Sequence, residues 1–222
     1  MKKDHLKNTV RTVLKIVFGL LYRVRVNNIE NIPDKGAAIL CPNHVAELDM
    51  FVIGYKIERL IRWMAKAELF KWQPVRWFIT RFGAFPVKRG KNDVDAMKTA
   101  MRLIDEGHIV GIFPEGTRMK SHRVGAAMKI HLGAVMLALK KDVPVIPAGI
   151  SGNYRPFTRI TVNFGQPFNI REEYEKRRAQ VMGEKANPFE KTYTKDEMRE
   201  IGRMILDRIY SLTGNKADSA EA

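Results

Sequence analysis

The sequence predicts an α/β domain in which helices flank a central sheet of mostly parallel or mixed strands. Short apolar runs, typical of buried strands, alternate along the chain with longer stretches of helical periodicity, as they do in layered α/β folds. The 222 residues suffice for one domain, and 45% of them are apolar, which is enough for a sizeable core and unlike a disordered chain.

Residues 1–25 predict a basic amphipathic helix that associates with a membrane. Their longest apolar run, Ile16 to Tyr22, is much shorter than the roughly 20 residues that a spanning helix needs. Arg11 and Lys15 share one helical face. The opposite face carries Val10, Val13, Leu14, Val17, Phe18 and Leu21. This pattern favours a helix lying in the bilayer interface, and the alternative is a helix docked on the protein's own core. A secretory signal is disfavoured, because Arg23 and Arg25 follow instead of a small-residue cleavage site.

Beyond that segment, hydrophobic periodicity together with capping and turn residues predicts the strands and helices in chain order. Strands are expected at 37–41, 60–65, 84–87, 109–113, 143–147 and 160–164. Helices are expected at 49–55, at 74–82, between Asn92 and Gly107, at 126–139 and after Thr194. Pro74 suits a first helical position, and Thr194 forms a capping-box pattern with Glu197. The domain is expected to span 26–214, with 215–222 as a flexible tail.

Charge and cysteine content narrow the classes of partner. Lys and Arg total 39 against 24 Asp and Glu, and the formal net charge of +15 favours an anionic partner: nucleic acid, anionic lipid or an acidic carrier protein. A nucleic-acid-binding module would cluster its cations among exposed aromatics. Here the cations are spread along the chain, and the aromatics of 72–82 follow helical spacing. The single cysteine, Cys41, rules out an internal disulfide and a multi-cysteine zinc site, and it favours a reducing, cytosol-facing location.

A histidine and an aspartate five residues apart, His44 and Asp49, form the candidate chemical pair. They lie where a predicted strand ends and a helix begins, so a turn can bring the carboxylate to the imidazole Nδ1–H. That contact fixes the tautomer and leaves Nε2 to take a proton, as in a general base. The alternative is a capped helix with an incidental histidine. No Gly-x-Ser-x-Gly elbow is present, and Cys41 reads as a core residue. The pair would therefore activate an external hydroxyl, in direct acyl or group transfer to an alcohol.

Three further motifs contain or adjoin predicted strands. Phe113 to Arg118 reads Phe-Pro-Glu-Gly-Thr-Arg, a turn at the carboxyl end of a strand, where open α/β sheets bind ligands. Thr117, Arg118 and the backbone N–H groups of that turn are suited to cradle a phosphate. Gly83 to Arg89 ends in two cations, which on their own read as solvated surface charges. Val143 to Pro147 contains two prolines, which favour an edge strand or a strand end.

In this order the motifs resemble those of the glycerolipid acyltransferases, in particular the 1-acyl-sn-glycerol-3-phosphate (lysophosphatidate) acyltransferases. The matching motifs are Asn-His-x4-Asp at 43–49, Gly-x-Phe-x-Val-x-Arg at 83–89, Phe-Pro-Glu-Gly-Thr-Arg at 113–118 and Val-Pro-Val-Ile-Pro at 143–147. The resemblance covers residues 26–170. Met64 to Leu69 is similar to the family segment whose lysine, here Lys66, helps to hold the substrate phosphate. The stretch 119–124 departs from the family in being more basic than its usual linker.

The resemblance implies transfer of a fatty acyl group from acyl-CoA or acyl-carrier protein to the sn-2 hydroxyl of 1-acyl-sn-glycerol-3-phosphate, giving phosphatidic acid in phospholipid biosynthesis. His44 would deprotonate that hydroxyl, and Asp49 would orient His44. The other implied site residues are Lys66, Arg89 and Arg118 on the acceptor phosphate, Glu115, Gly116 and Thr117 shaping that pocket, and Pro147 on the acyl-donor side. The resemblance implies no metal or bound cofactor. The amphipathic helix, the single cysteine and the lipid acceptor together predict a peripheral or monotopic location on the cytoplasmic face of the cell membrane. Glycerol-3-phosphate or another lysolipid stays open as the acceptor, and a basic nucleic-acid-binding module is the remote alternative.

Overall fold

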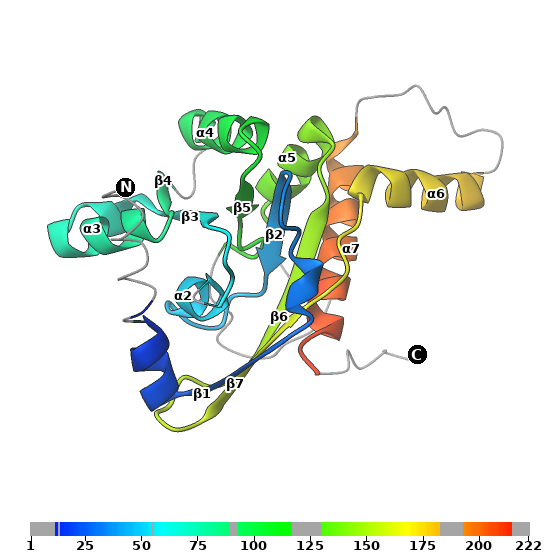
Figure 1. Ribbon diagram of the computed structural model, residues 1–222. Coiled ribbons are helices and arrows are strands. Elements are labelled where there is room, and N and C mark those ends of the chain that lie inside the picture. Colours follow the sequence, from blue (N-terminus) through cyan, green and yellow to red (C-terminus); the bar gives the residue numbers. More distant parts are fainter. Residues whose placement is uncertain are drawn as a thin grey trace.

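A computed structural model describes the chain over residues 12, 14–54, 56–88, 93–116, 130–182 and 193–214. These residues form a seven-stranded sheet with the strand order β1-β7-β6-β2-β5-β3-β4 (Figure 1). The strands are β1 Arg23–Asn27, β2 Ala38–Pro42, β3 Ile61–Lys66, β4 Phe85–Val87, β5 Ile109–Gly111, β6 Val145–Gly152 and β7 Arg159–Phe164. Neighbouring strands pair in parallel, except that β6 and β7 are antiparallel. The predicted α/β fold with a central mixed sheet is therefore confirmed.

Helices cover both faces of this sheet. The helices are α2 Asp49–Gly54, α3 Gln73–Arg81, α4 Val94–Asp105, α5 Gly133–Lys141, α6 Ile170–Met182 and α7 Lys195–Ser211, with 3-10 turns η1 Ile29–Asn31 and η2 Ala67–Phe70. One apolar cluster joins the sheet to the helical residues 14–21, α2 and α3, and the other joins it to α4, α5, α6 and α7. Figure 1 shows α7 running alongside β6, near the middle of the sheet. The result is a three-layer α/β arrangement.

The central strands are buried because helices cover them on both faces. Every residue of β2, from Ala38 to Pro42, is buried, as expected for a strand with parallel neighbours. Ile39 and Cys41 face the cluster of α4 to α7, whereas Leu40 faces the opposite cluster, since successive side chains of a strand alternate between faces. The apolar runs of the sequence therefore become the shared middle of two cores.

Helix boundaries follow the local capping signals. Thr194 and Glu197 form the predicted capping box at the start of α7. The N-cap of α4 is Asp93, whose side chain accepts from the Ala96 N–H at 3.1 Å, one residue beyond the predicted cap. The helix predicted at 126–139 is described from Gly133 onward as α5, and 126–129 lie outside the described residues.

Two sequence predictions about strands are corrected. First, the helix predicted over 1–25 ends earlier than expected, because Arg23 already begins β1. Val24 and Val26 of this strand pack on the core. Alternating polar and apolar residues there follow the period of a strand. Second, the prolines of 143–147 were expected at an edge strand or a strand end. The edge strand is wrong, since β6 lies between β7 and β2, whereas the strand end is confirmed for Pro144, which directly precedes β6. Pro147 is tolerated because the ladder to β7 is interrupted beside it, between the Val145–Phe168 bridge and the pairing that resumes at Ala148.

The amino-terminal helix is partly docked and partly exposed. Leu14 and Phe18 are buried against the body of the protein. Other large apolar side chains of the helix are exposed, namely Val17 and Leu21 on the same face and Ile16 and Leu20 on the opposite side. Val10 and Val13 lie outside the described residues, and membrane association of this helix stays a prediction. Within the described part of the chain, no helix has the length and apolar character needed to cross a bilayer.

Candidate active site

The sequence motifs come together at one edge of the sheet. Strands β2, β5, β3 and β4 are neighbours and run in parallel, so their carboxyl ends lie side by side. His44 follows β2, Glu115 follows β5, and Lys66 ends β3. Ligands of open α/β sheets bind at this edge.

The contact predicted between His44 and Asp49 is present. His44 Nδ1 lies 2.8 Å from Asp49 Oδ2. Asp49 begins α2 and is fully buried, whereas His44 keeps 9% of its surface exposed. An ionised carboxylate only accepts hydrogen bonds, so Nδ1 carries the hydrogen in this contact. The lone pair of Nε2 is then available to a reacting group, and no described residue donates a hydrogen bond to it.

Asp49 is held by three further donors. Its Oδ2 accepts from the Val45 N–H at 2.7 Å and from the Ala46 N–H at 2.8 Å. Its Oδ1 accepts from the hydroxyl of Tyr154, which follows β6. Burial and the nearby Asp49 carboxylate raise the pKa of Tyr154, so this phenol stays protonated and donates. With His44 Nδ1, four donors compensate for the loss of water around this buried side chain.

The loop that carries His44 is fastened from two sides. Asn43 donates from Nδ2 to the Ile150 carbonyl at 2.9 Å and accepts the Ile150 N–H at 2.7 Å, which ties the loop to β6. On the other side, the Glu115 carboxylate accepts the backbone N–H of His44 at 3.1 Å and the hydroxyl of Tyr210 on α7. Burial raises the pKa of Glu115, and both hydrogen bonds oppose that rise. The backbone of His44 is thus anchored to elements far away in sequence.

An aromatic stack fixes the plane of the imidazole. The His44 ring lies on the Phe113 ring with centroids 4.2 Å apart, and Phe113 in turn stacks on Trp63 at 5.4 Å. Trp63 belongs to β3 and is almost fully buried. Because Asp49 fixes one end of the ring and Phe113 fixes its face, His44 has little freedom to rotate.

The structure describes some of the residues predicted to hold a phosphate or to shape its pocket, and others lie outside the described residues. Lys66 is exposed beside the site edge, with Nζ 3.6 Å from Glu68 Oε1. Gly116 has a φ of +64°, and a Cβ there would lie 2.1 Å from the His131 ring, so the turn after β5 requires glycine. Glu115 contacts protein groups, as described above, so its place is beside His44. The remaining three, Arg89, Thr117 and Arg118, lie outside the described residues.

Pro147 and Cys41 lie within the sheet. They face each other in the β2–β6 register, and both are buried. Pro147 contacts Gly165, whose N–H donates to its carbonyl at 2.8 Å. Burial raises the pKa of the Cys41 thiol to about 12, which is unsuited to a nucleophile and agrees with its prediction as a core residue.

Sequence reasoning missed Tyr154 and Tyr210 as neighbours of the pair. They are 105 residues from Asp49 and 95 from Glu115 respectively, so no local spacing indicates these contacts. Asn43 was noticed only as part of a motif, although the amide next to a candidate base at a strand end is a signal for a loop anchor. Together these groups orient the imidazole of His44 beside a buried carboxylate and leave its Nε2 free. The imidazole can therefore take a proton from a hydroxyl and return it to a leaving group.

Comparisons with known proteins show what the chain is similar to. The family model described as Acyltransferase matches residues 23–151. A 1-acyl-sn-glycerol-3-phosphate acyltransferase of Bacillus subtilis is 37% identical over 141 residues, which are 63% of this chain and 68% of that protein. A chloroplastic 1-acyl-sn-glycerol-3-phosphate acyltransferase of Arabidopsis thaliana is 31% identical over 134 residues, 59% of this chain but only 36% of that protein.

A solved structure shares the fold. The crystal structure of a 1-acyl-sn-glycerophosphate acyltransferase from Thermotoga maritima superposes with a TM-score of 0.64 at 20% sequence identity. The match covers 95% of this chain and 80% of that one, so the two proteins share the α/β fold.

Proposed function

The chain belongs to the acyltransferase family, whose members are enzymes, and from this premise we propose that it acylates the sn-2 hydroxyl of 1-acyl-sn-glycerol-3-phosphate with a fatty acyl group from acyl-CoA or acyl-carrier protein. The observation that carries the proposal is the His44–Asp49 pair, with Nδ1 and Oδ2 2.8 Å apart at the carboxyl edge of the sheet. The names of the relatives support lysophosphatidate as the acceptor. The product is phosphatidate, an intermediate of phospholipid synthesis.

In the proposed reaction, His44 Nε2 removes the proton of the acceptor hydroxyl as its oxygen attacks the thioester carbonyl. Asp49 holds the imidazole by Nδ1 and stabilises the positive charge that forms on it. The carbon–sulfur bond then breaks, and the imidazolium returns the proton to the departing thiolate. The balance is one ester formed, one thioester broken and one thiol released. Neither a covalent enzyme intermediate nor a metal or bound cofactor takes part in this scheme.

We assign the acceptor phosphate to Lys66, Arg89 and Arg118, with Gly116 and Thr117 shaping the pocket. Strand order supports this assignment, because β5, β3 and β4 are neighbours and these residues end or follow those strands. A cationic pocket for a dianionic headgroup next to a general base holds the hydroxyl in place for attack. Glu115 supports the loop of His44 in this scheme, and Pro147 contributes to the acyl-donor side only as part of β6, beneath that loop.

The acceptor is a lipid, so we further propose a peripheral or monotopic position on the cytoplasmic face of the cell membrane. Exposed large apolar residues near the carboxyl ends of the strands support this location. They are Leu48 after β2, Leu69 and Trp72 after β3, and Phe157 after β6. Exposed tryptophan and leucine are suited to the interface of a bilayer.

An acceptor comparison tests the proposed function. Purified protein is given one acyl-CoA and, separately, lysophosphatidic acid, lysophosphatidylcholine or glycerol-3-phosphate in the same detergent, and acylated product is measured by mass spectrometry. Lysophosphatidylcholine keeps the acyl chain and the hydroxyl but masks the phosphate, whereas glycerol-3-phosphate keeps the phosphate but lacks the chain. We expect the highest kcat/KM with lysophosphatidic acid. Faster acylation of either other compound would assign the acceptor to it instead.

A further inference from the structure

A basic pocket lies apart from the His44–Asp49 pair. It has a volume of about 770 Å³ and opens between the helical residues 14–21 and the edge strand β1. Five cationic side chains line it: Lys15, Arg23, Arg25, Lys56 and Arg159. Among the residues that the structure describes, none that lines the hollow is acidic. We name these five residues and the hollow between them the basic pocket.

Four of the five cations of the basic pocket have no acidic partner among the residues that the structure describes. For Lys15, Arg23, Arg25 and Arg159, no carboxylate of the described ranges lies within ion-pair distance. Arg25 Nε instead donates to Asn27 Oδ1 at 3.1 Å, which adds no negative charge. Like charges gathered around one hollow repel each other, and a bound anion removes that cost. The pocket therefore suits an anionic ligand.

The surroundings of the basic pocket are apolar. On the helix, Ile16 and Leu20 are 56% and 70% exposed. Phe157, at the tip between β6 and β7, is 73% exposed, and its N–H donates to the Leu21 carbonyl beside the pocket. A soluble anion has no apolar part for these side chains to contact. The headgroup of a lipid carries acyl chains, which exposed apolar side chains beside the pocket can contact.

Strand direction places the basic pocket at the same edge of the sheet as His44. Because β7 runs antiparallel to β6, its first residue, Arg159, lies near the carboxyl end of β6, and Arg23 of β1 is its register partner. Tyr22, which lines the pocket, packs its ring against Tyr154 with centroids 5.9 Å apart. Tyr154 is the residue that donates to Asp49.

We propose that the basic pocket binds the phosphate-bearing headgroup of an anionic membrane phospholipid, and so docks the active-site edge of the protein onto the bilayer. This inference rests on the proposed function, since only an enzyme with a lipid acceptor needs its site held against a membrane. It adds to that function a second lipid site, which is separate from the acceptor phosphate pocket.

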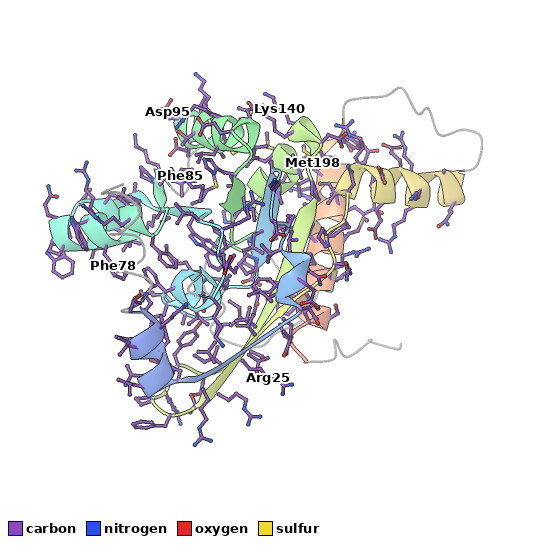
Figure 2. All side chains as sticks on the ribbon, in the orientation of Figure 1. Arg25, Phe78, Phe85, Asp95, Lys140 and Met198 are labelled. Carbon is purple, nitrogen blue, oxygen red and sulfur yellow. The ribbon has the colours of Figure 1, made fainter. Side chains whose placement is uncertain are left out.

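Vesicle binding by matched variants of the full chain tests this site. The pocket variant is Arg23→Gln, Arg25→Gln and Arg159→Gln, and the control is Lys98→Gln, Lys140→Gln and Arg203→Gln, exposed cations of α4, α5 and α7 on the other layer. Figure 2 shows Arg25 and Lys140 at opposite ends of the molecule. Both variants lose three positive charges. A difference in vesicle binding between them therefore reports on the position of the charges and not on the net charge.

Each protein is sedimented with phosphatidylcholine vesicles with and without phosphatidylglycerol. A basic residue near an anionic leaflet strengthens binding about fivefold, so the pocket variant should bind phosphatidylglycerol vesicles about 100-fold more weakly, with a much smaller loss in the control. Equal losses in the two variants, or wild-type binding by the pocket variant, would overturn the proposal. Weaker binding of inorganic phosphate or a DNA oligonucleotide by the pocket variant than by the control, with equal binding of phosphatidylglycerol vesicles by both variants, would also overturn it, by assigning the pocket to a soluble anion.

Activity measurements distinguish an error in the proposed pocket from an error in the proposed function. With lysophosphatidic acid dispersed in neutral detergent, the pocket variant should keep the kcat and acceptor KM of the unchanged protein. A tenfold rise in acceptor KM there would make the basic pocket part of the acceptor site and contradict the second site. If the unchanged protein acylates no lysophosphatidic acid, the proposed function fails, while the vesicle comparison still reports on the pocket.

Discussion

Replacing Asp49 with asparagine removes the charge beside His44 and leaves the shape of the side chain. The amide oxygen can take the place of Oδ2 and keep the His44, Val45 and Ala46 donors. The amide nitrogen would then face Tyr154, whose hydroxyl can accept as well as donate. We therefore expect Asp49→Asn to fold, with the tautomer of His44 retained and only the stabilisation of the imidazolium lost.

The size of that loss follows from the distance between the two groups. Opposite charges 2.8 Å apart attract by about 6 kcal/mol at an effective dielectric constant of about 20, which is an upper limit. Since about 1.4 kcal/mol corresponds to a factor of ten in rate, kcat should fall by about 10²–10⁴-fold. Acceptor KM should change little, because Asp49 is fully buried and does not reach the acceptor.

The assay is release of free thiol from acyl-CoA with lysophosphatidic acid in detergent, at saturating concentrations of both substrates. Asp95→Asn, on the exposed part of α4, is the matched control and should keep the kcat of the unchanged protein. Thermal unfolding followed by circular dichroism checks that both variants are folded. If Asp49→Asn keeps kcat within threefold while folded, the charge of Asp49 has no part in the reaction and the reasoning is refuted.

Three other predictions concern single residues. Tyr154→Phe removes one donor to Asp49 and should lower kcat about tenfold or more, since a hydrogen bond to a charged group contributes about 1.5–3 kcal/mol; an unchanged kcat would leave Tyr154 without a positioning role. Burial raises the pKa of Cys41 to about 12, so at pH 8 about 10⁻⁴ of the thiol is ionised, and maleimide should neither label nor inhibit the folded protein; rapid labelling would contradict this. Arg118→Ala should raise the acceptor KM more than the donor KM, because it removes a charged phosphate donor; the reverse pattern would place Arg118 on the thioester side.

The elements that the sequence predicts well are those with local signals. Buried runs such as Ile109 to Gly111 became central strands, and the capping box at Thr194 begins α7. Strand β1 was missed because its first four residues alternate Arg and Val directly after a basic helix, where a helical and a strand pattern both fit. Helix α6 was missed because charged residues occupy most of its sides. Too few of its residues are apolar and buried to give a helical hydrophobic pattern.

The same distinction applies to the candidate site. His44 and Asp49 meet across five residues, so a turn argument finds their contact. Tyr154 and Tyr210 approach the pair from β6 and α7, and only the packed sheet brings them there. Glu115 was expected at a phosphate, because its motif lies at a strand end. Its burial and its hydrogen bond to the His44 N–H place it in the support of the loop, which depends on β2 and β5 being neighbours.

The central claim is that the imidazole of His44 removes the proton of the acceptor hydroxyl. The most direct measurement is single-turnover formation of phosphatidate by His44→Ala, with enzyme in excess over acyl-CoA and lysophosphatidic acid in detergent. The side chain of His44 is mostly buried beside Phe113, so unfolding and vesicle binding of the variant are measured in parallel. We predict that the rate falls by at least about 10²–10⁴-fold, the contribution of a positioned base, while folding and vesicle binding persist. Phosphatidate formation at the rate of the unchanged protein would contradict the mechanism.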